Sequence, residues 1–321
     1  MNLTFKKKSF FFKLSSKVDN ANTTYKYKSG WIIKLKNIKN EIGFGEVNPL
    51  RKKDLDICQI QLNQIPEYVN SKNISQQIKS FHPCVQSAIN SAIAEIERKI
   101  NFKKNYYFNE IDQTAILLNP FKALEELKIL KANKLFNKKS LTIKWKVGIQ
   151  DNASEEKILI EILNNLRSNI KLRIDANGSW KRKIANRWVD ILKDIKNLDW
   201  LEQPLSKDDI EGLRELNKRI PIALDESLLK YPYLINEWDG WQIRRPSQET
   251  NPMHLLKELK DKKGFRSLST SFETVIGRRW LFHLSSLQLL GLTPKVPGLA
   301  FKKNPNSFLF LNEPQKIWDK L

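Results

Sequence analysis

The stretch Leu172-Arg-Ile-Asp175 is a short apolar segment that ends on a carboxylate. The same pattern returns at Trp200-Leu-Glu202 and at Ile222-Ala-Leu-Asp225, with amphipathic helical sequence in the intervals. Repeated strand–helix units of this kind predict a parallel sheet. Seven or eight such units in about 190 residues would close into a (β/α) barrel, in which functional residues lie at the C-terminal ends of the strands.

Further strand-like segments lie on both sides of these three. Residues 115–119 and 141–146 come before them, and residues 241–245 and 267–269 come after them. The polar residues that end the segments from Lys146 onward recur every 20–29 residues, which is enough for one strand, one helix and two loops. We therefore expect an α/β fold in which residues 109–299 form a (β/α)7β-type TIM barrel.

The first hundred residues follow a different pattern. Residues 25–47 alternate in the manner of two strands joined by a turn, and apolar residues recur at helical spacing from Val85 to Ile100. This predicts a separate N-terminal α+β domain over residues 1–108. We expect residues 300–321, which follow the barrel, to pack back on that domain.

Composition excludes several classes of protein. The chain has 321 residues with 56 Lys+Arg against 35 Asp+Glu, a net charge of +21, but the lysines are spread along its whole length. A nucleic-acid-binding protein would concentrate this charge on one face, so we expect no nucleic-acid partner. No apolar run approaches 18 residues, which excludes a membrane-spanning helix. Two cysteines exclude a disulfide framework and favour a reducing, cytoplasmic location.

Three of the segment-ending residues, Asp175, Glu202 and Asp225, come from successive strand–helix units. Neighbouring strands lie about 4.7–4.9 Å apart, so these carboxylates can converge on one point. They would repel one another unless a cation neutralised them, and oxygen ligands without Cys or His favour Mg²⁺, with Mn²⁺ as a possible substitute. Any one of them could instead cap a helix or pair with a lysine, but that explanation is weak for three at regular strand ends.

Two lysines precede this set by one unit. Lys144 and Lys146 fall on the same face of their strand, with Trp145 on the other face. Two ammonium groups side by side near a divalent cation should each lose a proton more easily, and a neutral amine is a competent general base. In a chain so rich in lysine, this pattern alone carries little weight.

Taken in order, the motifs resemble the enolase superfamily of the mandelate racemase/muconate lactonising enzyme type, and within it the o-succinylbenzoate synthases. That superfamily pairs a Lys or His base with Mg²⁺. The N-terminal domain would then be the family's capping domain. The resemblance covers nearly the whole chain and rests on Ser29-Gly-Trp31, Gly43-Phe-Gly-Glu46, His82-Pro-Cys-Val85, Lys144-x-Lys146, Leu172-Arg-Ile-Asp-Ala-Asn177, Leu201-Glu-Gln-Pro204, Ala223-Leu-Asp-Glu-Ser227, Ser269-Thr-Ser-Phe-Glu-Thr-Val-Ile-Gly277 and Pro297-Gly298-Leu299.

The resemblance implies a role for each residue of the strand ends. Asp175, Glu202 and Asp225 would be the ligands of Mg²⁺. Lys146 would be the catalytic acid and base, and Lys144 would be its electrostatic neighbour.

The resemblance also implies a substrate. It would be a small dicarboxylate, a succinylated hydroxycyclohexadiene carboxylate that loses water to give o-succinylbenzoate for menaquinone or phylloquinone synthesis. Arg173 would lie near this substrate. Backbone N–H groups around Ser269–Ser271 would bind its succinyl carboxylate.

One position departs from the family pattern. The sixth strand of related enzymes usually ends with Lys-Pro, whereas this chain reads Ile243-Arg-Arg-Pro246, so that Arg245, or Arg244 in another alignment, replaces the lysine. Arginine does not lose its proton at working pH. The chain therefore lacks the second base of a racemase or epimerase, but a one-base syn dehydration needs only positive charge there, and arginine can stack on a ring.

Other functions remain open from the sequence. The chain could be another enolase-superfamily enzyme, such as an acylamino-acid racemase, a dipeptide epimerase or a muconate cycloisomerase. It could also be a basic nucleic-acid-binding protein, which would lose affinity steeply with salt, or a barrel that binds ligand without turnover. The sequence does not define the oligomeric state.

Overall fold

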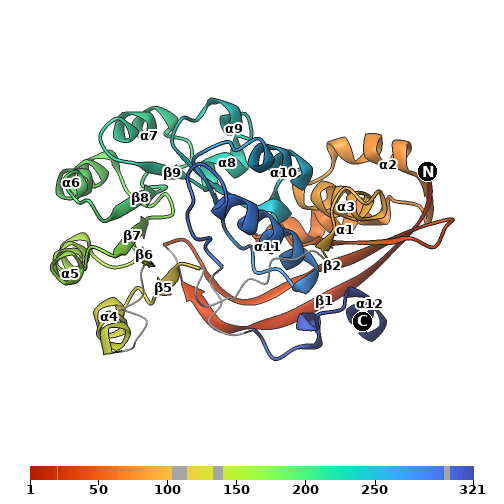
Figure 1. Ribbon diagram of the computed structural model, residues 1–321, viewed down its shortest axis with the longest axis horizontal. Helices are drawn as coiled ribbons and strands as arrows, with labels where there is room; N and C mark the ends of the chain where they lie inside the picture. Colours follow the sequence, from red (N-terminus) through yellow and green to blue (C-terminus); the bar gives the residue numbers. More distant parts are fainter. Residues whose placement is uncertain (20, 103–113, 133–139, 300–303) are drawn as a thin grey trace.

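The chain is built on two sheets, which Figure 1 shows in a computed structural model that describes residues 1–19, 21–102, 114–132, 140–299 and 304–321. The first sheet is antiparallel, with strand order β3-β2-β1-β4. Its strands are β1 (Asn2–Asp19), β2 (Thr24–Asn37), β3 (Ile42–Val47) and β4 (Tyr68–Asn70). The hairpin expected within residues 25–47 corresponds to β2 and β3. The long strand β1 was not expected.

Three helices accompany this sheet: α1 (Leu55–Asn63), α2 (Ser71–Gln77) and α3 (Pro83–Ile96). Helix α3 packs closely on β3 because the strand has glycine where the helix backbone approaches. A Cβ atom on Gly43 would lie 2.0 Å from the carbonyl oxygen of Ala92, and one on Gly45 would lie 2.0 Å from that of Ala88. Small residues on both elements thus bring sheet and helix together around a core that includes Ile33, Leu35, Val85 and Ile89.

The second sheet is parallel and curls into a barrel. Its strand order, β11-β10-β9-β8-β7-β6-β5, is the sequence order, as expected for successive strand–helix units. Residues 296–299 join the two edges, because Pro297 accepts a hydrogen bond from the Ala115 nitrogen and Gly298 forms a parallel bridge with Ser269. The strands are β5 (Ile116–Leu118), β6 (Leu141–Lys146), β7 (Ile170–Asp175), β8 (Leu198–Glu202), β9 (Ile222–Leu224), β10 (Trp241–Arg244) and β11 (Arg266–Leu268).

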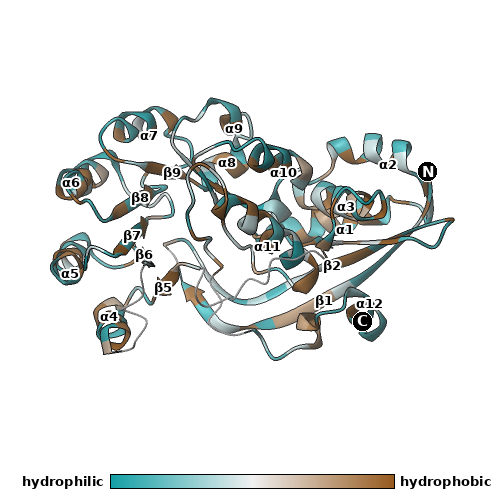
Figure 2. Cartoon of the chain, viewed as in Figure 1, coloured by the Kyte–Doolittle hydropathy of each residue, from teal (hydrophilic) through white to brown (hydrophobic). Residues whose placement is uncertain are grey.

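Helices cover the outside of the barrel, and those around the sheet carry both polar and apolar surface in Figure 2. They are α4 (Ala123–Ala132), α5 (Asn152–Asn165), α6 (Arg182–Leu192), α7 (Ile210–Asn217), α8 (Glu226–Lys230), α9 (Leu234–Glu237), α10 (Pro252–Lys260) and α11 (Val275–Leu289). The outward side chain of Trp145 packs near Trp188 of α6, with ring centres 6.1 Å apart. The alternation of β6 therefore sends Lys144 and Lys146 to the inside.

The last helix, α12 (Pro314–Lys320), returns to the first sheet. Ile317 and Trp318 share an apolar cluster with Phe10 and Phe12 of β1, and the Trp318 carbonyl accepts a hydrogen bond from Lys8 at 2.9 Å. The boundary between the expected domains, at residues 108 and 109, lies outside the described residues, so this division stays a prediction. None of the helices described here is both long and apolar enough to cross a membrane.

The four-stranded antiparallel sheet, called the capping sheet from here on, is tied to the barrel at the start of α11. Glu46 of β3 accepts hydrogen bonds from the backbone nitrogens of Thr274 and Gly277, at 3.0 and 2.9 Å. Burial raises the pKa of Glu46 to about 7, against the opposing effect of its hydrogen bonds with Thr274. A buried carboxyl group therefore joins the two sheets beside the mouth of the barrel.

Candidate active site

Three carboxylates meet at the C-terminal ends of neighbouring barrel strands. Asp175 and Glu202 are the last residues of β7 and β8 and lie directly opposite each other in the register of these strands. Asp225 follows β9 immediately. All three are at most 2% exposed. The sequence predicted this arrangement because parallel strands place their carboxyl ends at one edge.

Both lysines of β6 reach this group. The Lys144 Nζ atom lies 2.7 Å from Glu202 Oε1 and 2.9 Å from Asp175 Oδ2, and the Lys146 Nζ atom lies 3.3 Å from Asp175 Oδ2. Burial lowers the pKa of Lys144, but the charges of Asp175 and Glu202 outweigh burial and raise it above its usual range. The nearest neighbours of Lys144 are therefore carboxylates, which favour its charged form. The expectation that two lysines beside a divalent cation lose a proton more easily stays a prediction.

The pKa values of Asp175 and Glu202 are shifted in opposite directions by their surroundings. Burial alone would raise the pKa of Asp175, but Lys144 and Lys146 outweigh it and hold that pKa below its usual range. Burial, followed by the charge of Asp175, raises the pKa of Glu202. The charged form of Asp175 therefore depends on the two lysines beside it, and the charge of Asp175 in turn disfavours a charge on Glu202.

Arg245, and not Arg244, faces the pocket. Its guanidinium group forms a fork with Asp225, with Nε–Oδ1 and Nη2–Oδ2 distances of 2.9 and 2.6 Å, and it also donates to the Thr270 carbonyl. Arg244 points away and pairs with Glu249 and Glu258. Burial lowers the pKa of Arg245, but Asp225 more than offsets this, so the group stays charged. The choice that the sequence left open is thus resolved.

Two residues near the carboxylates had no predicted role. Asn177, at φ 47°, accepts a hydrogen bond from Lys146 Nζ at 3.0 Å and donates to Glu226 Oε1 at 3.0 Å. Gln203, at φ 38°, accepts from the backbone nitrogens of Asp225 and Ser227, both at 3.1 Å. Their signal in the sequence was their position, one or two residues after a strand-end carboxylate.

The predicted substrate-binding residues separate in the structure. Ser269 lines the pocket, whereas Arg173 and Ser271 are not among its lining residues. Arg173 lies inside the barrel, where its Nε atom is 3.1 Å from Asp199 and its Cζ atom is 4.0 Å from the ring centre of Trp200. Its position therefore gives no support to a contact with substrate.

The backbone N–H groups of residues 269–272 are already occupied. The nitrogen of Ser269 donates to the Arg244 carbonyl at 3.0 Å, and that of Thr270 donates to the Gly298 carbonyl at 3.0 Å. The nitrogen of Ser271 donates to the carboxylate of Glu273. Because these N–H groups already donate to other groups of the protein, the structure gives no support to the expectation that they bind a substrate carboxylate.

The chemistry of the three strand-end carboxylates fits a divalent cation such as Mg²⁺, since all the donors are oxygens and all are buried. Within the described ranges, no three acidic, His or Cys side chains are grouped closely enough as they stand to hold a metal ion. Instead, Lys144 and Arg245 supply the positive charge. One further oxygen, Oε2 of Glu226, is buried and has no hydrogen-bond partner among the residues that the structure describes.

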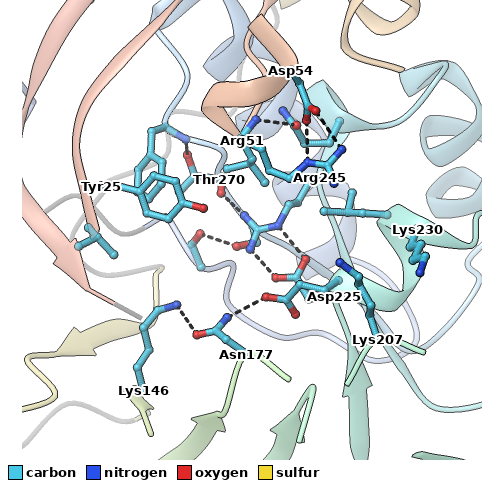
Figure 3. Close-up of a pocket in the computed structure, with 18 of the residues that line it drawn as sticks. Tyr25, Arg51, Asp54, Lys146, Asn177, Lys207, Asp225, Lys230, Arg245 and Thr270 are labelled. Atoms are coloured by element: carbon cyan, nitrogen blue, oxygen red, sulfur yellow. Dashed lines mark hydrogen bonds and ion pairs between the residues drawn. The ribbon is translucent and has the colours of Figure 1, made fainter. Parts of the chain in front are cut away.

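These groups open into a pocket of about 460 Å³ that is lined by both the capping sheet and the barrel. In Figure 3, Lys146 points toward Asn177, and Arg245 points toward Asp225. Tyr25 lies on the capping side. Such a site can place an amine base, a guanidinium group and several carboxylates around one small molecule.

Comparison with known proteins agrees with this geometry. Residues 131–234 match the family model described as "Enolase C-terminal domain-like". An o-succinylbenzoate synthase from Thermosynechococcus vestitus is 28% identical over 84% of this chain and 85% of its own length. An L-Ala-D/L-Glu epimerase from Bacillus subtilis is 37% identical over 27% of this chain and 25% of its own length.

A solved structure gives the same fold. The o-succinylbenzoate synthase of Thermosynechococcus elongatus BP-1, complexed with Mg in its active site, superposes with a TM-score of 0.73 at 23% identity, covering 99% of this chain and 100% of that one. The expected barrel with a capping domain is confirmed. The resemblance to the enolase superfamily and to its o-succinylbenzoate synthases is confirmed as well.

Proposed function

We propose that this chain, which resembles the o-succinylbenzoate synthases of the enolase superfamily, is a carbon–oxygen lyase. Its reaction would be the syn-dehydration of 2-succinyl-6-hydroxy-2,4-cyclohexadiene-1-carboxylate to o-succinylbenzoate, a step of menaquinone or phylloquinone synthesis. The observation that carries the proposal is the position of Lys146, whose amine enters the pocket beside Asp175, with the permanently charged Arg245 also in the pocket.

The chemistry follows from these residues. The amine of Lys146 acts as the base and takes the proton from the ring carbon that bears the carboxylate, and the electron pair left behind moves toward that carboxylate. The same nitrogen then returns the proton to the hydroxide that leaves the neighbouring carbon on the same face. One water is lost, the ring becomes aromatic, and Lys146 ends in its starting form.

Other groups orient and stabilise. Asn177 accepts a hydrogen bond from Lys146 at 3.0 Å and thereby fixes the direction of the amine. Asp175, Glu202 and Asp225 would hold a divalent cation, which would supply positive charge to the substrate carboxylate as the proton leaves.

A second candidate is an epimerase of the same superfamily, which the local similarity to L-Ala-D/L-Glu epimerase favours. Epimerisation by two bases needs a proton acceptor on each face of the carbon. Arg245 is the residue available in place of the second lysine, and a guanidinium group does not accept protons. This difference supports the lyase over the epimerase.

The test is a spectroscopic assay of the purified chain with Mg²⁺ or Mn²⁺ and the cyclohexadiene substrate. We expect the absorbance to change as the ring becomes aromatic, and no change with Lys146→Ala. Folded wild-type protein that leaves the diene intact, yet exchanges the α-proton of N-acylated amino acids for deuterium, would favour the epimerase instead.

A further inference from the structure

The pocket continues outward into a second hollow of about 890 Å³ between the capping domain and the barrel. Six residues line both hollows, so they mark the passage between them: Tyr25, Leu50, Arg51, Asn177, Lys207 and Glu226. Two of them are cations from opposite sides. Arg51 comes from the segment after β3, and Lys207 comes from the segment after β8. Both therefore line the pocket that holds Lys146 as well as the outer hollow.

The outer hollow is strongly positive. Among the described residues that line it, the only acidic one is Glu226, and its cations are Lys26, Lys28, Arg51, Lys52, Lys53 and Lys207. Because clefts lined by one sign of charge concentrate ligands of the opposite sign, this surface favours an anion.

Arg51 and Lys207 both carry hydrogen-bond donors that could bind a ligand. The Nε and Nη2 atoms of Arg51 bind Asp54 at 2.7 and 3.0 Å, which fixes the guanidinium plane and leaves further N–H groups of its five. The backbone of Lys207 is held by a hydrogen bond from the Ser227 hydroxyl to its carbonyl at 3.1 Å. Across the described part of the chain, the Lys207 ammonium makes no hydrogen bond or ion pair.

Most donors at the inner end of the pocket are already paired, and Lys230, which also lines the pocket, pairs with Asp208 at 2.6 Å. The N–H groups of residues 269–272 are occupied, and Arg245 is held by Asp225. For a substrate with one carboxylate on its ring and another at the end of a succinyl chain, Arg51 and Lys207 are then the cations of this pocket with donors left for the second carboxylate.

We propose that Arg51 and Lys207 form the subsite for the terminal carboxylate of the substrate. This rests on the proposed function, since it takes the ring carboxylate to lie near Lys146. The two residues are specificity determinants: they select ligands that carry a second carboxylate at the outer end. Neither takes part in proton transfer.

The test uses binding of the product and of an analogue, measured by calorimetry. The ligands are o-succinylbenzoate and 2-butyrylbenzoate, in which a methyl group replaces the terminal carboxylate. The variants are Arg51→Gln and Lys207→Gln, with Lys52→Gln as a matched control, because Lys52 lines only the outer hollow. We expect Arg51→Gln and Lys207→Gln each to lower the affinity for o-succinylbenzoate by about tenfold or more. Their affinity for 2-butyrylbenzoate should stay unchanged.

The control separates a local contact from the general field, and Lys52→Gln should change neither affinity more than about twofold. Arg51→Lys keeps a charge beside Asp54 and should restore part of the loss. The proposed subsite would be overturned if the variants lost affinity for both ligands equally, or if Lys52→Gln had an equal effect. Turnover of the diene by the wild type would still support the lyase in that case. A folded wild type that neither converts the diene nor binds o-succinylbenzoate would overturn both proposals.

Discussion

Arg245 and a divalent cation would share one carboxylate, so removing Arg245 should strengthen metal binding. The guanidinium group holds both oxygens of Asp225, at 2.9 and 2.6 Å, and its side chain is 13% exposed. We expect Arg245→Met to bind Mn²⁺ more tightly than the wild type. Without metal, the same variant should be less stable, because Asp225 loses its partner in a buried site.

The magnitude follows from the fork. A hydrogen bond to a charged group contributes about 1.5–3 kcal/mol, and a cation that takes Asp225 must weaken at least one such bond. Since 1.4 kcal/mol is a factor of ten, the gain in Mn²⁺ affinity should be about ten- to hundredfold. Arg245→Lys keeps the charge but not the two-pronged hydrogen bonding to Asp225. Its Mn²⁺ affinity should therefore lie between those of the wild type and Arg245→Met.

Free Mn²⁺ can be measured by electron paramagnetic resonance during a titration, and thermal unfolding with and without Mn²⁺ gives a second reading. The control is Lys230→Met, which removes a cation from the same pocket but one that pairs with Asp208 at 2.6 Å and does not touch the carboxylate set. Unchanged or weaker Mn²⁺ binding in Arg245→Met would refute the competition. If Lys230→Met raised the Mn²⁺ affinity as much as Arg245→Met did, the increase would come from the lower net charge alone.

Four other substitutions test the remaining residues of the site and the buried carboxyl group of Glu46. Lys146→Ala should abolish dehydration in a protein that still folds and still binds Mn²⁺; turnover near the wild-type rate would remove its role as base. Asp175→Asn and Glu202→Gln should each weaken Mn²⁺ binding and activity together, and normal binding in either would remove that residue from the ligand set. Because burial raises the pKa of Glu46 to about 7 from about 4.3 when unfolded, its protonated form favours the fold. The free energy of unfolding should therefore fall by roughly 3–4 kcal/mol from about pH 4 to pH 7 relative to Glu46→Gln, as followed by urea unfolding; parallel curves would contradict this.

The carboxylates could be predicted because their positions depend on a simple rule of parallel sheets. Asp175, Glu202 and Asp225 end consecutive strands, and such ends share one edge of the barrel. The inward direction of Lys144 and Lys146 followed from strand alternation in the same way.

What could not be predicted depends on contacts between distant segments. The N–H groups of Ser269 and Thr270 pair with the carbonyls of Arg244 and Gly298, and nothing in the local sequence reveals those partners. The raised pKa of Lys144 likewise reflects two carboxylates from other strands. The sequence did not predict strand β1, because Lys6, Lys7 and Lys8 interrupt the alternation of its apolar residues.

Diffraction from crystals of the chain grown with Mn²⁺ and o-succinylbenzoate would locate the cation by its anomalous signal. We predict a single strong peak bound by Asp175, Glu202 and Asp225, at about 2.0–2.3 Å from each, with the Lys146 amine facing the ring of the ligand. A peak that misses these carboxylates, or a Lys146 side chain turned away from the bound ring, would contradict the proposed lyase mechanism.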